Sequence, residues 1–196
     1  IGGGLLWMTA NKTVSEIAVT KPVIEQTASV YEKSIAVLPF VNMSADKDNE
    51  YFSDGISEEI LNALVKVADL KVAGRTSSFY FKGKNESLIT IGETLGVANV
   101  LEGSVRKQGE KVRITAQLIR TKDGFHLWSE TYDGDLKDVF ALQEKLAQAI
   151  TTQLQVILQG DQKNRLAQVG TSNTEAYALY LQATAIFNRR EGARFA

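Results

Sequence analysis

The hydrophobic pattern of the chain changes abruptly at Ser34, where a continuous apolar run begins. This run reads Ile-Ala-Val-Leu-Pro-Phe-Val over residues 35–41 and is typical of a strand that is covered on both faces. Pro39 has no N–H group to donate to a neighbouring strand. The pattern therefore predicts a buried strand that lies at the edge of a sheet or ends close to Pro39.

A helix and a second strand are predicted to follow the polar loop 42–54. Apolar residues recur at helical spacing over 55–67, which predicts an amphipathic helix with Asp54 as its N-cap. Residues 70–76 then have the pattern of a second strand. A strand, a helix and a strand in this order predict a β-α-β unit, in which the two strands are parallel.

The following stretch predicts a short helix, an antiparallel meander and a long helix. Thr90 and Glu93 have the spacing of a capping box, and Gly96 is suited to end the helix that they begin. Apolar and polar residues alternate from 112 onwards, as in a half-buried strand. The meander is predicted at residues 98–107, 111–120 and 125–132, and the long helix at 137–159, ended by Gly160 and lying across the sheet.

Together these elements predict an α/β (α+β) fold with a mixed five-stranded sheet, formed by residues 34–159 as one domain. Residues 160–172 are interpreted as a polar connector. Residues 173–196 contain a further helix, and its aromatic surface is too large for a single helix to bury, so we expect another helix to pack against it. Its large apolar residues are Tyr177, Tyr180, Leu181, Ile186 and Phe187.

The N-terminal residues 1–8 are apolar and uncharged, and two interpretations remain open for them. They are either the end of a transmembrane helix, with Trp7 at the lipid–water boundary, or an apolar linker. Eight residues cannot themselves span a bilayer, which takes about 20. Residues 9–33 lack a sustained period and are interpreted as an extended tether.

Composition excludes several classes of function. The formal net charge is −1, and Lys and Arg are spread along the chain, so we expect no nucleic-acid binding by this region. The chain has no cysteine, which excludes disulfides, thiol nucleophiles and thiolate metal sites. The lack of cysteine fits a reducing compartment and the bacterial periplasm equally well, so composition leaves the location open.

The sequence contains no recognisable catalytic motif. His126 is the single histidine, and the alternation of its strand places it on one face with Trp128. We expect this face to pack against a helix; the alternative is a pH-sensitive or ligand-stacking face. Glu58 and Glu59 are interpreted as solvated helix surface. Calcium-loop, phosphate-loop and nucleophile-elbow patterns are absent, so we expect no enzyme activity, no cofactor and no metal.

One binding hypothesis rests on the predicted β-α-β unit. Ligands tend to bind beyond the carboxyl ends of parallel strands, where a helix N-terminus offers free N–H groups and a positive dipole end. Arg75 at this corner would hold a carboxylate or a phosphate; alternatively, it pairs with Asp54 or Asp69 and closes the loop. The candidate binding residues are Asn42, Asp54, Gly55, Arg75, Thr76, Ser77 and Ser78, together with Trp128 on the meander.

Five segments taken together resemble a known extracytoplasmic module. They are SIAVLPF (34–40), YFSDGI (51–56), LGVANVLEGSV (95–105), VRITAQL (112–118) and GFHLWSETYD (124–133). In this order they resemble the TolB N-terminal-like domain. The segment NTEAYALYL at 173–181 resembles the first helix of the tetratricopeptide repeats that usually follow this module.

The resemblance implies a place in a bacterial membrane-anchored regulator or an adenylate-cyclase-like protein. It further implies an upstream output domain, a membrane helix that begins before this chain, a periplasmic location for this region, and protein partners. We therefore expect a non-catalytic protein–protein interaction and sensing module. The alternative is a sensor that binds a small anion or a nucleotide at the Arg75 corner.

Overall fold

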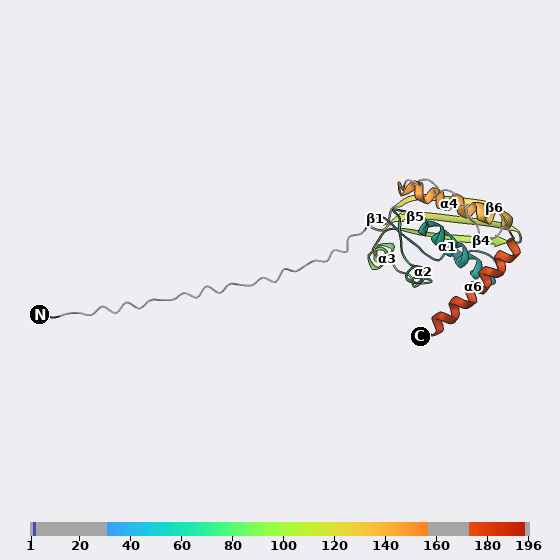
Figure 1. Ribbon diagram of the computed structural model, residues 1–196, viewed down its shortest axis with the longest axis horizontal. Helices are drawn as coiled ribbons and strands as arrows, with labels where there is room; N and C mark the ends of the chain where they lie inside the picture. The colour runs from blue at the N-terminus through green and yellow to red at the C-terminus, as the bar shows by residue number, and fades with distance from the viewer. Residues whose placement is uncertain (1, 3–30, 157–172, 195–196) are drawn as a thin grey trace.

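A computed structural model describes residues 2, 31–156 and 173–194 of the chain (Figure 1). The expected connector 160–172 and helix end Gly160 lie outside the described residues, as do nearly all of 1–8 and of the tether 9–33. Within the described part, no helix combines the length and the apolar character that crossing a membrane requires.

The centre of the fold is a six-stranded mixed sheet in the order β3-β1-β4-β5-β6, with β2 paired to β4. β1 runs parallel to β3 and β4, while β4, β5 and β6 form the expected antiparallel meander. The parallel pairing of the first two predicted strands is thus confirmed. The strands are β1 (Tyr31–Val37), β2 (Val41–Asn42), β3 (Lys71–Val72), β4 (Val97–Gln108), β5 (Lys111–Arg120) and β6 (His126–Asp135).

The sixth strand arises because Pro39 divides the first predicted strand in two. The backbone N–H of Leu38 still donates to Leu101 at 2.9 Å, but the N–H of Phe40 turns away and donates to the Ser57 hydroxyl at 2.8 Å. Pairing with β4 resumes at Val41. The prediction that the strand ends near Pro39 is confirmed, since proline cannot continue the ladder.

The predicted helices are present, but not all of their boundaries are as predicted. The long helix ends at Gln153 and not at 159, since residues 154–156 are no longer helical. α1 begins five residues earlier than expected, so Asp54 lies inside it and the N-cap position is Asn49. α3 begins after Ser87, whose hydroxyl accepts from the N–H of Thr90, and Gly96 ends it in the left-handed conformation as predicted. The helices are α1 (Glu50–Val65), α2 (Arg75–Phe79), α3 (Leu88–Leu95), α4 (Val139–Gln153) and α6 (Thr174–Arg194), with 3-10 turns at Lys47–Asn49 and Leu136–Asp138.

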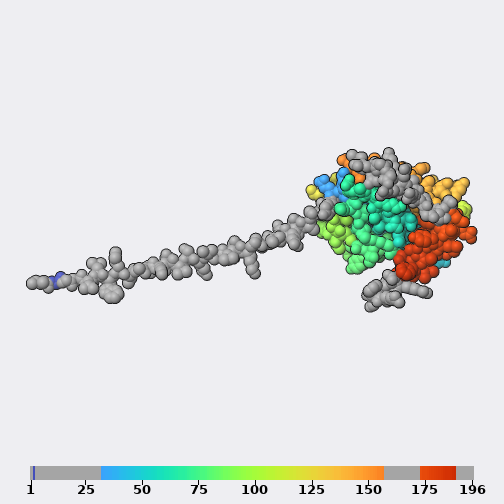
Figure 2. All heavy atoms as spheres, viewed as in Figure 1, coloured from blue at the N-terminus to red at the C-terminus, as the bar shows by residue number. Residues whose placement is uncertain are grey.

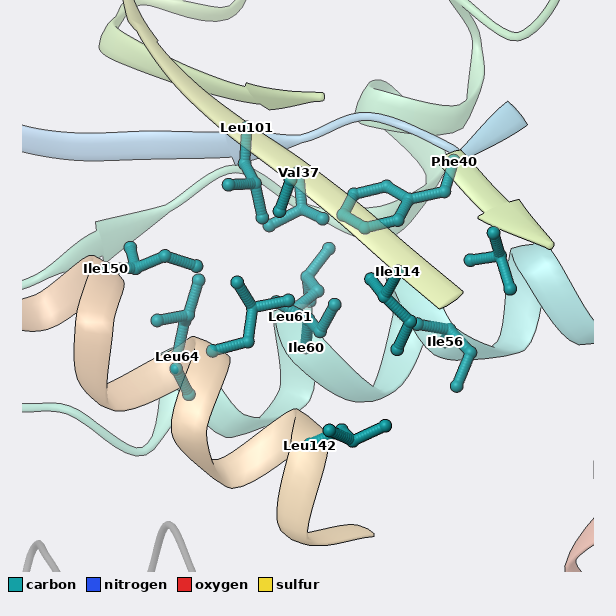
Figure 3. Close-up of a cluster of buried hydrophobic side chains, with 14 of the residues drawn as sticks. Val37, Phe40, Ile56, Ile60, Leu61, Leu64, Leu101, Ile114, Leu142 and Ile150 are labelled. Atoms are coloured by element: carbon teal, nitrogen blue, oxygen red, sulfur yellow. The ribbon is translucent and has the colours of Figure 1, made fainter. Parts of the chain in front are cut away.

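Helices α1 and α4 lie side by side over one face of the sheet and enclose the main core (Figures 1 and 3). Figure 3 shows side chains from both helices converging on those of β1, β4 and β5. A smaller cluster on the other face includes Ala36, Ile91 and Val100, under α3. The fully buried members of the main core include Ile35, Val37, Phe40, Ile56, Ile60, Leu64, Leu101, Ile114, Leu118, Leu146 and Ile150.

A β-bulge in β6 changes the face on which His126 lies. Leu118 pairs with Trp128, but the next residue of β5, Ile119, pairs with His126, so Leu127 is an extra residue. Successive residues of a strand point to opposite faces, so His126 and Trp128 lie on opposite faces of the sheet. The prediction that they share a face is therefore wrong. Trp128 packs against the main core as expected, whereas His126 is exposed.

Candidate functional site: a groove between α1, α2 and α6

The corner predicted at residues 70–76 is built differently from the expected strand end. β3 is short, and its ladder closes with a bond from the N–H of Ala73 to Ile35. Gly74 is extended, and Arg75 is the first residue of α2. Ser and Thr residues weaken a sheet ladder, because their hydroxyls can hydrogen-bond to nearby backbone groups instead. The predicted strand over 70–76 is therefore wrong beyond Val72.

A groove of about 930 Å³ lies at this corner, between α1, α2 and the middle of α6. It contains four of the predicted binding residues, namely Asp54, Gly55, Arg75 and Thr76. The remaining lining residues come mostly from the two helices that flank α2. They are Glu50, Tyr51, Glu58, Phe79, Tyr80, Lys82, Leu181, Thr184, Ala185 and Asn188.

The α1 wall of the groove carries Glu50, Asp54 and Glu58, four residues apart and therefore on one helix face. The ammonium of Lys82 bridges the first two: its Nζ lies 2.7 Å from Glu50 Oε1 and 2.6 Å from Asp54 Oδ1. Burial raises the pKa of Asp54 above its ordinary value, and the bond from Lys82 offsets this only partly. The wall therefore holds a carboxylate that is short of solvation.

Arg75 is paired, but not with the partners that the sequence suggested. Its Nε donates to Glu58 Oε2 at 2.8 Å, and its guanidinium stands 4.2 Å from the centre of the Phe79 ring. Neither Asp54 nor Asp69 is the partner, since Asp54 is bound to Lys82 instead. The interpretation of Glu58 as solvated surface is wrong, because its side chain is only 20% exposed.

Gly55 forms the floor of the groove, not a helix N-terminus. A Cβ at this position would lie 2.5 Å from Cδ2 of Leu181, so α6 approaches α1 closely at this point. Because Gly55 lies inside α1, its N–H belongs to the helix and is not free for an anion. The helix N-terminus predicted beside Asp54 and Gly55 therefore lies elsewhere, at Asn49.

Helix α6 is held in place by two buried side chains, Tyr177 and Leu181. The Tyr177 ring meets Phe140 edge to face, with 4.7 Å between the ring centres. Its hydroxyl accepts a hydrogen bond of 2.8 Å from Nε2 of Gln143 on α4. Figure 2 shows α6, in red, lying directly against α1, so the third wall of the groove belongs to the same packed unit as the sheet.

The other predicted site residues do not line the groove. The Asn42 side chain is bound to the backbone of Ser44 and Asp46 and stabilises its own loop. Ser77 is exposed, while Ser78 is fully buried with no hydrogen-bond partner for its hydroxyl. Trp128 lies on the core side of β6, 6.4 Å from the Tyr132 ring.

Sequence reasoning missed most of the groove lining. One signal was available: Glu50, Asp54 and Glu58 have a four-residue spacing, but it acquires meaning only if the helix starts at Glu50. Lys82 and the α6 residues gave no signal, because they come from segments distant in the sequence. Among the residues that the structure describes, no group of three His, Asp or Glu side chains is placed to hold a metal ion.

A known protein family matches most of the α/β domain. The model of the family described as "HilA/YgeH-like transcriptional regulator, second domain" matches residues 31–149. This span contains the whole sheet together with α1 to α3 and most of α4. The chain belongs to this family.

A curated relative extends the comparison beyond the domain. A Rhizobium meliloti (strain 1021) protein that is named adenylate cyclase 3, as a proposed activity, is 45% identical to this chain over 150 residues. The match covers 76% of this chain and 26% of that protein. The chain thus spans about a quarter of the relative, and the activity in the relative's name belongs to a much longer polypeptide.

Solved structures with a similar arrangement include TolB from Acinetobacter baumannii, with a TM-score of 0.46 and 17% identity, covering 65% of this chain and 29% of TolB. Lipoprotein GNA1162 from Neisseria meningitidis has a TM-score of 0.46 and 21% identity, covering 65% and 99%. The C-terminal domain of LpoB from Salmonella enterica has a TM-score of 0.43 and 18% identity, covering 56% and 87%. Likeness at this level supports no inference about function.

Proposed function

We propose that this chain is a non-catalytic protein–protein interaction and sensing module of a membrane-anchored bacterial signalling protein, of the transcriptional-regulator or cyclase type. Two findings support a signalling context. The chain belongs to a transcriptional-regulator domain family, and it is 45% identical over 150 residues to a protein that is named as a cyclase. Both names describe longer proteins, in which this region would serve as an input to a separate output domain. The proposed location is the periplasmic side of the inner membrane.

The single observation that carries the proposal is the two-sided character of α6. One side buries Tyr177 and Leu181 against the α/β domain. The other side exposes two adjacent pairs of large apolar residues, and the pairs are seven residues apart, which places them on one helix face. These residues, here named the α6 stripe, are Leu179 (60% exposed), Tyr180 (52%), Ile186 (54%) and Phe187 (62%).

An exposed stripe on a helix that is firmly docked on its other side is typical of a contact surface. We propose that α6 is the first helix of a tetratricopeptide repeat region, in which further helices continue the packing and together form a surface for a protein partner. Rigid docking by Tyr177 would then transmit a contact on α6 to the sheet domain, because the two form one packed unit.

The non-catalytic part of the proposal is supported by how the charged groups of the groove are used. The Arg75 and Lys82 cations are each tied to carboxylates of α1. Ion pairs of this kind hold elements together and place no acid or base beside a nucleophile. Formation of cyclic AMP from ATP by the purified chain would overturn this part.

The interaction function can be tested by photo-crosslinking in cells that produce the protein. A photo-reactive amino acid at Tyr180 or Phe187 is expected to crosslink the same polypeptide from both positions. Phe125 is a matched control, since it is also aromatic and is 67% exposed, on the turn before β6. The same adducts from all three positions, or none from α6, would contradict the proposal.

A small-anion or nucleotide sensor at the Arg75 corner is the second candidate function. It is favoured by the open groove that Arg75 and Thr76 line, and it is opposed by the bond from Arg75 to Glu58. Phosphate, acetate and ATP at millimolar concentration would raise the melting temperature of the chain, and Arg75→Gln would abolish the rise. Equal melting temperatures with and without these anions would end this candidate.

A further inference from the structure

The α1 wall of the groove already binds an ammonium group. Nζ of Lys82 lies within hydrogen-bond distance of Glu50 and of both carboxylate oxygens of Asp54. Lys82 belongs to a turn after α2, and its side chain is 36% exposed. A partly exposed ion pair contributes little free energy to the fold, so an incoming cation can replace this ammonium at small cost.

The opposite side of the groove is suited to the stem of a lysine or arginine side chain. Ala185 is half-buried there, next to the almost completely buried Leu181, and the rings of Phe79 and Tyr80 border it. Tyr80 is 64% exposed, and Nζ of Lys84 lies 2.9 Å from the centre of its ring. Basic side chains pack their methylene stems on such rings and direct their charge towards carboxylates.

The charge balance of the groove favours a cation over an anion. Among the described lining residues, the carboxylates of Glu50, Asp54 and Glu58 outnumber the cations of Arg75 and Lys82. An incoming anion would have to displace Glu58 from Arg75 and then face the remaining carboxylates. An incoming cation meets a complementary field, and it can take the place of Lys82 beside the poorly solvated carboxylate of Asp54.

From these observations we propose that the groove between α1, α2 and α6 docks a basic segment of a partner protein. A lysine or arginine of that segment binds Glu50 and Asp54, and an apolar neighbour packs beside Ala185 and the exposed ring of Tyr80. The inference rests on the proposed interaction function and gives the partner its chemistry. A polypeptide is favoured over a free amine because the groove combines carboxylates with apolar and aromatic lining residues, and a segment of chain can contact both.

The test measures binding of two synthetic ten-residue peptides to the purified chain by fluorescence anisotropy. One peptide consists of Leu, Ala and Lys in an amphipathic order; the other has Gln in place of every Lys. The Lys peptide is expected to bind at least ten-fold more tightly than the Gln peptide. Its affinity should fall as salt is raised, because the contact is electrostatic.

Three variants locate the contact. Asp54→Asn should weaken binding of the Lys peptide several-fold, whereas Lys82→Met should strengthen it several-fold by removing the internal competitor. Asp133→Asn is the matched control: this aspartate is exposed on β6, paired with Arg113, and outside the groove, so binding should not change. Circular dichroism confirms that each variant is folded before binding is compared.

Equal losses in Asp54→Asn and Asp133→Asn, or no tightening in Lys82→Met, would overturn the inference. Displacement of the peptide by n-butylamine at matched lysine concentration would also overturn it, because the groove would then be a site for free amines. If crosslinks from the α6 stripe persist while the Asp54 variant loses nothing, the interaction function stands and the groove inference alone fails.

Discussion

The two sides of helix α1 show how one element serves both the fold and the site. The side towards the sheet presents Phe52, Ile56, Ile60 and Leu64, all almost completely buried. The side towards α2 and α6 presents Glu50, Asp54 and Glu58 around Gly55. The first side is fixed by packing, whereas the second is held by replaceable ion pairs. The difference teaches that the groove can change partners without disturbing the core.

The largest effect is expected from Ile60→Ala on the core side. Ile60 is fully buried, and its truncation leaves a cavity between the sheet, α1 and α4. The free energy of unfolding should fall by about 3 kcal/mol, measured by urea denaturation. Glu50→Gln on the other side of the helix is the control and should change it by less than about 0.5 kcal/mol. Equal losses of unfolding free energy in the two variants would show that the two sides of α1 do not differ in this way.

The next largest effect is expected from Leu181→Ala, which removes the side chain that seats α6 on Gly55. The docking of α6 should weaken by about 2 kcal/mol, equivalent to about a thirty-fold increase in its opening equilibrium. Amide hydrogen exchange should quicken within α6 and stay unchanged in β4 and β5. Leu179→Ala, on the exposed stripe, is the control that should leave exchange unaltered.

A smaller loss is expected from Tyr177→Phe, which keeps the ring contact with Phe140 but removes the hydroxyl. Nε2 of Gln143 then stays buried without its acceptor, which costs about 1 kcal/mol. Hydrogen exchange in α6 reports this loss, and Tyr180→Phe on the exposed side should show none. A loss as large as that of Leu181→Ala would indicate that the hydroxyl, not the apolar contact, fixes α6.

The smallest effects are expected from the carboxylates, and they differ in sign. Burial raises the pKa of Asp54, so its stabilising contribution is full below the unfolded-state pKa and is lost as pH rises through the folded-state pKa. Arg113 lowers the pKa of Asp133, so that contribution is present at neutral pH and is lost as pH falls. At pH 7, Asp54→Asn should therefore stabilise the protein slightly and Asp133→Asn should destabilise it slightly.

Titration followed by NMR sharpens this last comparison. The Asp54 carboxyl should titrate above, and Asp133 below, the ordinary range of aspartate pKa values. Lys82→Met should raise the pKa of Asp54 further, since Lys82 is the cation that opposes the effect of burial. An unchanged Asp54 pKa in this variant would show that the ion pair does not form in solution.

Hydrophobic periodicity alone predicted the type and order of most elements. The meander was placed to within a few residues, because alternation along residues 111–120 is a local property of a half-buried strand. Gly96 was correctly predicted to end a helix, since few other residues adopt its left-handed conformation. The start of α1 was missed because Glu50, Ser53 and Asp54 are polar and make this stretch resemble a loop, although Phe52 continues the four-residue spacing of the buried face.

The site depended on information that is not local. The sequence pattern predicted a role for Arg75 but assigned it the wrong carboxylate partner. The choice between Asp54, Asp69 and Glu58 depends on how α2 packs against α1. The bulge at Leu127 is invisible to alternation, yet it decides the face of His126.

The sequence by itself determined most elements of this protein, because periodicity, turn residues and a proline act over a few neighbouring positions. Tertiary structure alone decided the groove. Its walls come from α1, α2 and α6, and more than a hundred residues separate Arg75 on α2 from Leu181 on α6. Distances between charged groups of such segments are set by packing, and the energy of an ion pair depends on those distances and on burial.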